Sequence, residues 1–81
     1  MAEEAKAISA FHQRWIVDTL KERGDSCTYE ELVKVGEEKQ CDTLGAMLRV
    51  LKGRKIVAYD EPFLMYPMHK DHVVNLIGDL I

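Results

Sequence analysis

The sequence predicts a small α+β domain in which three helices are followed by a small antiparallel sheet or hairpin. Upstream of Gly53, apolar residues recur with the 3.6-residue period of amphipathic helices. From Ile56 onward this period gives way to β-branched and aromatic residues, which fit a pleated, half-buried surface. A length of 81 residues suits one domain, so we expect residues 1–81 to fold as a single unit.

The first helix is expected over residues 3–23, ahead of a turn at Gly24 and Asp25. Its core-facing stripe is formed by Ile8, Phe11, Trp15, Ile16 and Leu20. The opposite side carries Gln13, Arg14, Asp18 and Lys21, with Val17 also facing outward. His12 falls inside the stripe, where we expect a hydrogen-bonded core histidine rather than a ligand or a catalytic base.

A second, short helix is expected to begin at Tyr29, after a bridge-like strand at Ser26–Thr28. The sequence Thr28-Tyr29-Glu30-Glu31 matches a capping box, in which the threonine hydroxyl accepts from an amide and the glutamate returns a bond. Its buried side is assigned to Leu32, Val33 and Val35 or Tyr29. Gly36 and the polar residues after it end or bend this helix.

The central helix is expected over residues 43–52. Leu44, Met47, Leu48 and Leu51 follow the i, i+3, i+4, i+7 spacing of one buried face. Asp42 occupies the position of an N-cap, and Gly53 that of a helix stop.

Two strand candidates follow, residues 56–59 and 63–68, separated by the turn-forming residues Asp60, Glu61 and Pro62. We expect these two strands to form a hairpin, with Pro67 ending the second strand or placing it at an edge. Residues 72–77 are a further strand candidate because of Val73 and Val74. Three helices followed by a hairpin is the order of a winged helix-turn-helix domain, an analogy that concerns the fold alone.

No motif of an enzyme or a metal site is present. The sequence contains no Gly-rich phosphate loop, nucleophile elbow or H-E-x-x-H motif, so we expect no catalysis and no cofactor. His69 and His72 with Cys27 and Cys41 lack the tight spacing of structural zinc ligands and are interpreted as two surface histidines and two reduced, buried thiols. No apolar run reaches the ~20 residues that span a bilayer, and the N-terminus does not resemble a signal peptide, so we expect a soluble intracellular protein.

The net charge of −3 is unevenly distributed along the chain. Bases concentrate in and around the central helix, at Lys34, Lys39, Arg49, Lys52, Arg54 and Lys55. This concentration is either an electrostatic footprint for an acidic partner or a complement to the negative end of the helix dipole.

The outward face of the central helix favours protein over nucleic acid as the partner. That face is expected to present Gly45, Ala46, Arg49 and Val50. A helix that reads a DNA groove is expected to present several of Arg, Lys, Asn, Gln and Ser, and phosphate contacts favour a basic domain. One arginine among small apolar residues suits a protein contact better.

A family resemblance appears in the second half of the chain. It rests on Gln40-Cys41, on Leu44, Leu48 and Leu51, on Arg54-Lys55-Ile56-Val57-Ala58-Tyr59, on Leu64, and on residues 69–74. In these residues the chain resembles the costars family, small proteins similar to the C-terminal domain of actin-binding Rho-activating protein. The resemblance implies a winged-helix-like fold, no catalytic activity, and a role in actin dynamics, cell motility and Rho-linked signalling. It also implies a cytoplasmic, cytoskeleton-associated location, with the nucleus as the alternative.

We therefore expect a non-catalytic module that contacts actin or an actin-associated protein. The predicted contact residues are Arg49, Lys52, Arg54 and Lys55, the densest basic cluster, because actin is acidic. The alternatives are a winged-helix protein that binds nucleic acid through its wing and basic turn, and an adaptor in an assembly unrelated to actin.

Overall fold

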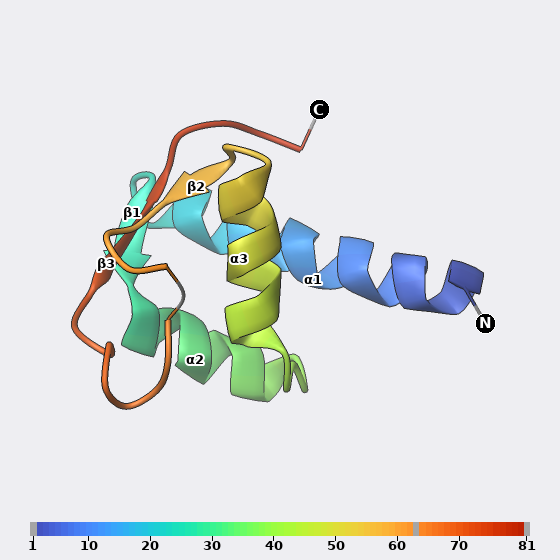
Figure 1. Ribbon diagram of the computed structural model, residues 1–81, viewed down its shortest axis with the longest axis horizontal. Coiled ribbons are helices and arrows are strands. Elements are labelled where there is room, and N and C mark those ends of the chain that lie inside the picture. Colours follow the sequence, from blue (N-terminus) through green and yellow to red (C-terminus); the bar gives the residue numbers. More distant parts are fainter. Residues whose placement is uncertain (1, 63, 81) are drawn as a thin grey trace.

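The computed structural model describes residues 2–62 and 64–80, with side chains from Ser9 onward. The elements in chain order are α1 (Ala2–Glu22), β1 (Ser26–Thr28), α2 (Tyr29–Glu38), α3 (Leu44–Gly53), β2 (Val57–Ala58) and β3 (Val73–Leu76). Figure 1 shows α3 crossing α1, the small sheet at one end, and the N-terminal turns of α1 extending past the other elements. The predicted α+β class, with three helices and a small antiparallel sheet, is confirmed.

The sheet has the order β1-β3-β2, and both pairings are antiparallel. Cys27 of β1 lies opposite Val74 of β3, and Ala58 of β2 lies opposite Asn75 of β3. Val74 is fully buried whereas its neighbours are exposed, which is the alternation of a sheet with one face on the core. The strands β2 and β3, which are consecutive in the chain, are joined by the long segment 59–72.

The predicted strand at residues 63–68 is wrong, and so is the hairpin it was expected to form. Residues 64–71 are loop and turn, and β2 pairs with β3 instead, inside the predicted 72–77 segment. Proline cannot donate to a ladder, and Pro62 and Pro67 flank the apolar residues of this loop. Phe63 lies outside the described residues.

The buried arc of α1 is wider than predicted and rotated. Trp15, Ile16 and Leu20 are buried as expected, but Val17 is 1% exposed and Phe11 is 54% exposed, the reverse of the prediction. Gln13, expected on the outer side, is also buried. The cause is that α1 contacts α3, β1 and β3 along one side while Trp15 lies against Gly36 of α2 on another. The side chain of Ile8 lies outside the described residues.

His12 is a hydrogen-bonded core histidine, as predicted. It is 8% exposed, and its Nδ1 accepts a hydrogen bond from Trp15 Nε1 at 3.0 Å. The indole donor and one imidazole nitrogen therefore satisfy each other inside the core, which removes the cost of burying two unpaired polar atoms.

Helix α2 begins where the capping box predicts. The Thr28 hydroxyl accepts from the amide of Glu31, so the threonine half of the box is confirmed. The Glu31 carboxylate does not return a bond to Thr28 but accepts from Arg23 at 2.8 Å. The helix passes through Gly36, which is buried, and ends at Glu38.

Both predicted ends of α3 are displaced. Thr43, not Asp42, is the N-cap, and its side chain makes no capping bond. Gly53 belongs to the helix, and the residue with positive φ is Lys55 (φ 61°). The amide of Ile56 donates to Leu51 O and that of Lys55 to Lys52 O, the two bonds of a Schellman motif in which Lys55 takes the position that glycine usually occupies.

The buried thiol of Cys27 makes the free energy of unfolding depend on pH in the alkaline range. Burial, and secondarily the charge of Glu31, raises its pKa from 9.0 to about 11. The native state thus keeps the thiol proton in a range where the unfolded chain releases it. This contribution is fully present below pH 9 and is lost as the pH rises through 11; the accumulated loss at pH 11 is about 2 kcal/mol.

We accordingly expect the free energy of unfolding, measured by urea denaturation, to fall between pH 9 and pH 11. Cys27→Ala should flatten this fall, whereas Cys41→Ala, which removes the half-buried thiol, serves as the control. Equal slopes for the wild type and Cys27→Ala would contradict the assignment. A shallower decline should persist in Cys27→Ala because burial also raises the pKa of Tyr29 and Tyr59.

Candidate functional site

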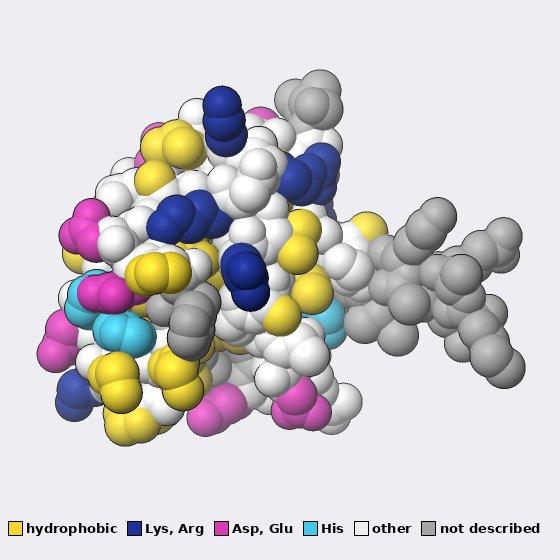
Figure 2. Space-filling model, viewed as in Figure 1, with side chains coloured by type: hydrophobic (Ala, Val, Ile, Leu, Met, Phe, Trp, Pro, Cys, Tyr) yellow, Lys and Arg dark blue, Asp and Glu magenta, His cyan; other side chains and the backbone are white. Residues whose placement is uncertain are grey.

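The four predicted contact residues lie together at the C-terminal half of α3. Arg49 and Lys52 are in the helix, and Arg54 and Lys55 form the Schellman turn that ends it. We call these four residues the α3 basic cluster. Figure 2 shows dark blue Lys and Arg side chains over α3 and its C-terminal end.

Lys52 is a structural member of the cluster. Its Nζ donates to Tyr59 O at 3.1 Å and to Glu61 O at 2.6 Å, and it lies 4.4 Å from the centroid of the Tyr59 ring. The side chain thereby ties the start of the 59–72 segment to α3. Among the described residues, its positive charge meets neutral carbonyl groups and a ring face and no carboxylate, so the charge is oriented but not neutralised.

Arg54 links α3 to α1. Its Nη1 donates to Gln13 Oε1 at 2.8 Å, and Gln13 Nε2 donates to Ser9 Oγ at 2.9 Å. This chain of bonds explains why a glutamine is buried on α1, a placement that helical periodicity alone does not predict. The partner of the guanidinium is again a neutral oxygen.

Arg49 and Lys55 are the two members with exposed side chains that make no side-chain hydrogen bond to any described residue. Arg49 lies close enough to the hydroxyl of Tyr59 for its charge to oppose the effect of burial, which raises the pKa of that tyrosine. The Tyr59 hydroxyl is buried and has no hydrogen-bond partner among the described residues. Arg49 therefore lies beside the base of the 59–72 segment with its guanidinium available to a partner.

The α3 basic cluster differs from most other described Lys and Arg residues in having no carboxylate partner. The cations that pair with carboxylates are Arg14 with Asp18 at 3.3 Å, Lys21 with Asp79 at 2.7 Å, Arg23 with Glu31 at 2.8 Å, and Lys34 with Glu30 at 3.7 Å. Within the described residues, no member of the α3 basic cluster has a carboxylate within 4.0 Å. Lys39 and Lys70 also lack an ion pair there, but they stand singly. The cluster is thus a local concentration of uncompensated positive charge.

The outward face of α3 is smaller than predicted because the segment after β2 covers part of it. Leu64 is 2% exposed, and its carbonyl oxygen lies 3.0 Å from the position that a Cβ at Gly45 would occupy. Gly45 therefore allows the backbone of this segment to approach the helix. The exposed remainder of the face consists of Ala46, Arg49 and Val50.

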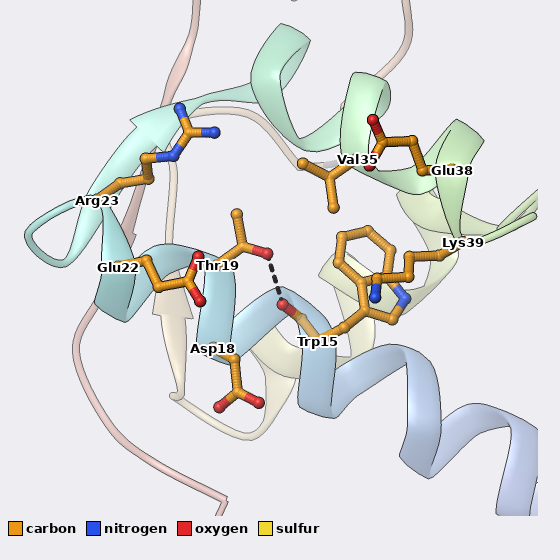
Figure 3. Close-up of a pocket in the computed structure, with 8 residues that line it drawn as sticks. All are labelled: Trp15, Asp18, Thr19, Glu22, Arg23, Val35, Glu38 and Lys39. Atoms are coloured by element: carbon orange, nitrogen blue, oxygen red, sulfur yellow. Dashed lines mark hydrogen bonds between the residues drawn. The ribbon is translucent and has the colours of Figure 1, made fainter.

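A groove of about 360 Å³ lies between α1 and α2, away from the basic cluster. Figure 3 shows the eight residues that line it: Trp15, Asp18, Thr19, Glu22, Arg23, Val35, Glu38 and Lys39. The Thr19 hydroxyl donates to Trp15 O at 2.7 Å, and Arg23 is held by Glu31. The lining contains neither a histidine nor a cysteine, and its one hydroxyl, that of Thr19, is already engaged.

The four residues considered for a metal site do not converge. The rings of His69 and His72 lie 5.0 Å apart between centroids, whereas Cys27 is in the core and both cysteines are free thiols. Across residues 2–62 and 64–80, no three His, Cys, Asp or Glu residues come together as metal ligands. In that same part of the chain, none of the helices has the length and apolarity needed to cross a bilayer.

Comparison with known proteins adds no relative. No family model matches the chain, and no curated protein and no solved structure matches it either.

Proposed function

We propose that this protein is a non-catalytic interaction module that modulates actin dynamics and cell motility, within Rho-linked signalling, by binding actin or an actin-associated protein. The observation that carries the proposal is the α3 basic cluster, in which four cations have no carboxylate partner among the described residues. Such a surface favours an acidic partner, because unpaired charges steer and orient a complementary surface. The resemblance to the costars family selects actin among acidic proteins.

We also propose that the fold is of the winged helix-turn-helix kind. The element order α1-β1-α2-α3-β2-β3 and the sheet order β1-β3-β2 support this assignment, with residues 59–72 as the wing between β2 and β3. In this arrangement α3 takes the place of the helix that in DNA-binding relatives of the fold enters the major groove. Fold alone does not choose between protein and nucleic acid.

Nucleic-acid binding is the second candidate function, because α3 occupies that place and carries the exposed Arg49. Ala46 and Val50, which flank Arg49 on the exposed face, offer no hydrogen-bonding group to base edges. The net charge of −3 also works against phosphate binding. An adaptor role in an assembly unrelated to actin is the third candidate, and it differs only in the identity of the protein partner.

The test is an amide-shift titration of the isotope-labelled protein with monomeric actin in low-salt buffer, with duplex DNA in parallel. We expect shifts or broadening with actin centred on residues 45–55 and none with DNA. Shifts with DNA alone would favour the second candidate, and that binding should weaken by roughly 10³-fold or more between 50 and 200 mM salt if several phosphates are contacted. Silence with both ligands would contradict direct binding to either.

A further inference from the structure

Among its described residues, the 59–72 segment presents three large apolar side chains that are exposed and that the core does not use. Met65, Tyr66 and Met68 are 48%, 51% and 74% exposed, and we call them the apolar tip. Figure 2 shows yellow side chains gathered at the lower left, where the loop of Figure 1 projects below β3. Single exposed apolar residues are ordinary, but a cluster on one short loop is typical of an interaction site.

The apolar tip is held in shape by hydrogen bonds. The amide of Met65 donates to His69 Nδ1 at 3.0 Å, and the amide of His69 donates to Met65 O at 2.8 Å. Lys70 N donates to Pro67 O at 3.3 Å, which closes the turn. Because the loop is ordered before binding, less conformational entropy is lost when its side chains become immobilised.

Both ends of the loop are fixed to helices. Toward β3, the amides of Glu30 and Tyr29 at the start of α2 donate to Lys70 O at 3.0 Å and His72 O at 2.9 Å. Toward β2, Leu64 is buried and Lys52 holds the carbonyls of Tyr59 and Glu61. The apolar tip is therefore positioned relative to the helices and is not a loose connection.

The apolar tip and the α3 basic cluster adjoin through α3. The carbonyl of Leu64, next to Met65, packs at Gly45, and Arg49 follows Gly45 by one helical turn on the same face. Residues 43–59 contain no Asp or Glu, whereas Asp60 and Glu61 lie at the start of the loop, where Glu61 Oε2 is 4.0 Å from His69 Nε2. On its other side, Lys70 is followed by Asp71 and the two charges offset each other.

From this continuity we propose that the apolar tip inserts into an apolar pocket on an acidic protein, whose carboxylates border that pocket and face the α3 basic cluster. The proposal rests on the proposed function, of which it specifies the binding mode. Methionine adapts to an irregular pocket, and tyrosine brings a large apolar ring with a polar end that hydrogen-bonds at the rim. The apolar tip would supply most of the apolar area buried in the interface, and the cations would orient the two proteins relative to each other.

The test compares three proteins for affinity to monomeric actin at two salt concentrations. The variant M65S/M68S removes the two exposed methionines of the apolar tip, and Ile77→Ser, at a 60% exposed position beyond β3, is the matched control. We expect M65S/M68S to bind roughly tenfold more weakly or worse with the same salt dependence, and Ile77→Ser to bind as the wild type does. Retained amide shifts at His69 and Lys70 in M65S/M68S establish that the loop is still folded.

The outcomes separate this inference from the proposed function. Wild-type affinity in M65S/M68S overturns the role of the apolar tip and leaves the basic cluster as the site. Failure of the wild type to bind actin overturns direct binding to actin and, with it, this inference. Two further outcomes also overturn the proposal: sedimentation with vesicles of phosphatidylcholine and phosphatidylserine that depends on the apolar tip, in place of actin binding, and self-association that M65S/M68S abolishes.

Discussion

The variant R49E/K55E is expected to bind monomeric actin about 100-fold more weakly than the wild type in low-salt buffer. Arg49 and Lys55 are exposed and hold no other described side chain, so their reversal changes the surface charge without removing an internal contact. Placing like charges across an interface costs several kcal/mol, and about 3 kcal/mol corresponds to this loss of affinity. Lys52 and Arg54 are unsuitable for the same purpose because their hydrogen bonds hold the 59–72 segment and α1.

The matched control is K34E/K39E, which changes the net charge by the same four units on α2 and just after it. Lys34 is paired only with Glu30 at 3.7 Å, and its side chain is 71% exposed, so the fold should tolerate this variant. We expect K34E/K39E to lose only a few-fold in affinity. Equal losses in the two variants would mean that overall charge governs binding, and no loss in R49E/K55E would exclude the α3 basic cluster as the contact surface.

Features encoded by neighbouring residues could be predicted from the sequence. The start of α2 follows from the Thr28 side chain and its bond to the amide of Glu31, both within one turn. The buried face of α3 follows from the spacing of Leu44, Leu48 and Leu51, all of which are buried. Such signals act within a few residues, so they are visible before any tertiary contact is known.

Strand pairing could not be predicted in the same way. The apolar run after Pro62 was interpreted as the partner of β2 because it follows at the distance of a hairpin. β3 lies between β1 and β2 and satisfies both, with Val74 buried against Cys27. Competition between two partners for one strand is settled by tertiary packing, which sequence proximity does not report.

Which cations of the candidate site lack a carboxylate partner also could not be predicted from the sequence. The composition shows where the bases lie, but the pairing of Arg23 with Glu31 and the availability of Arg49 depend on which side chains the fold brings together. The apolar tip was missed because its residues were assigned to a strand. A proline on each side of an apolar run was the available signal that the run is a loop.

Leu48→Ala should be the most destabilising of the substitutions considered, at about 3 kcal/mol in the free energy of unfolding. Leu48 is fully buried in α3, the helix that packs on both α1 and β2, so its truncation leaves a cavity at the junction of these elements. An 81-residue domain has a total stability of about 4 to 12 kcal/mol, so the loss is a large part of it.

Urea denaturation of Leu48→Ala and Val50→Ala compares, within one helix, the loss in the free energy of unfolding at a buried and at an exposed position. Val50 is 42% exposed, so its truncation should cost less than about 1 kcal/mol. Comparable losses in the two variants would contradict the orientation of α3, and with it the exposure of Arg49 between them. Leu48 is buried and is not part of the contact surface, so Leu48→Ala should weaken actin binding only in proportion to the fraction of unfolded protein. In contrast, R49E/K55E should weaken actin binding in a protein that remains folded.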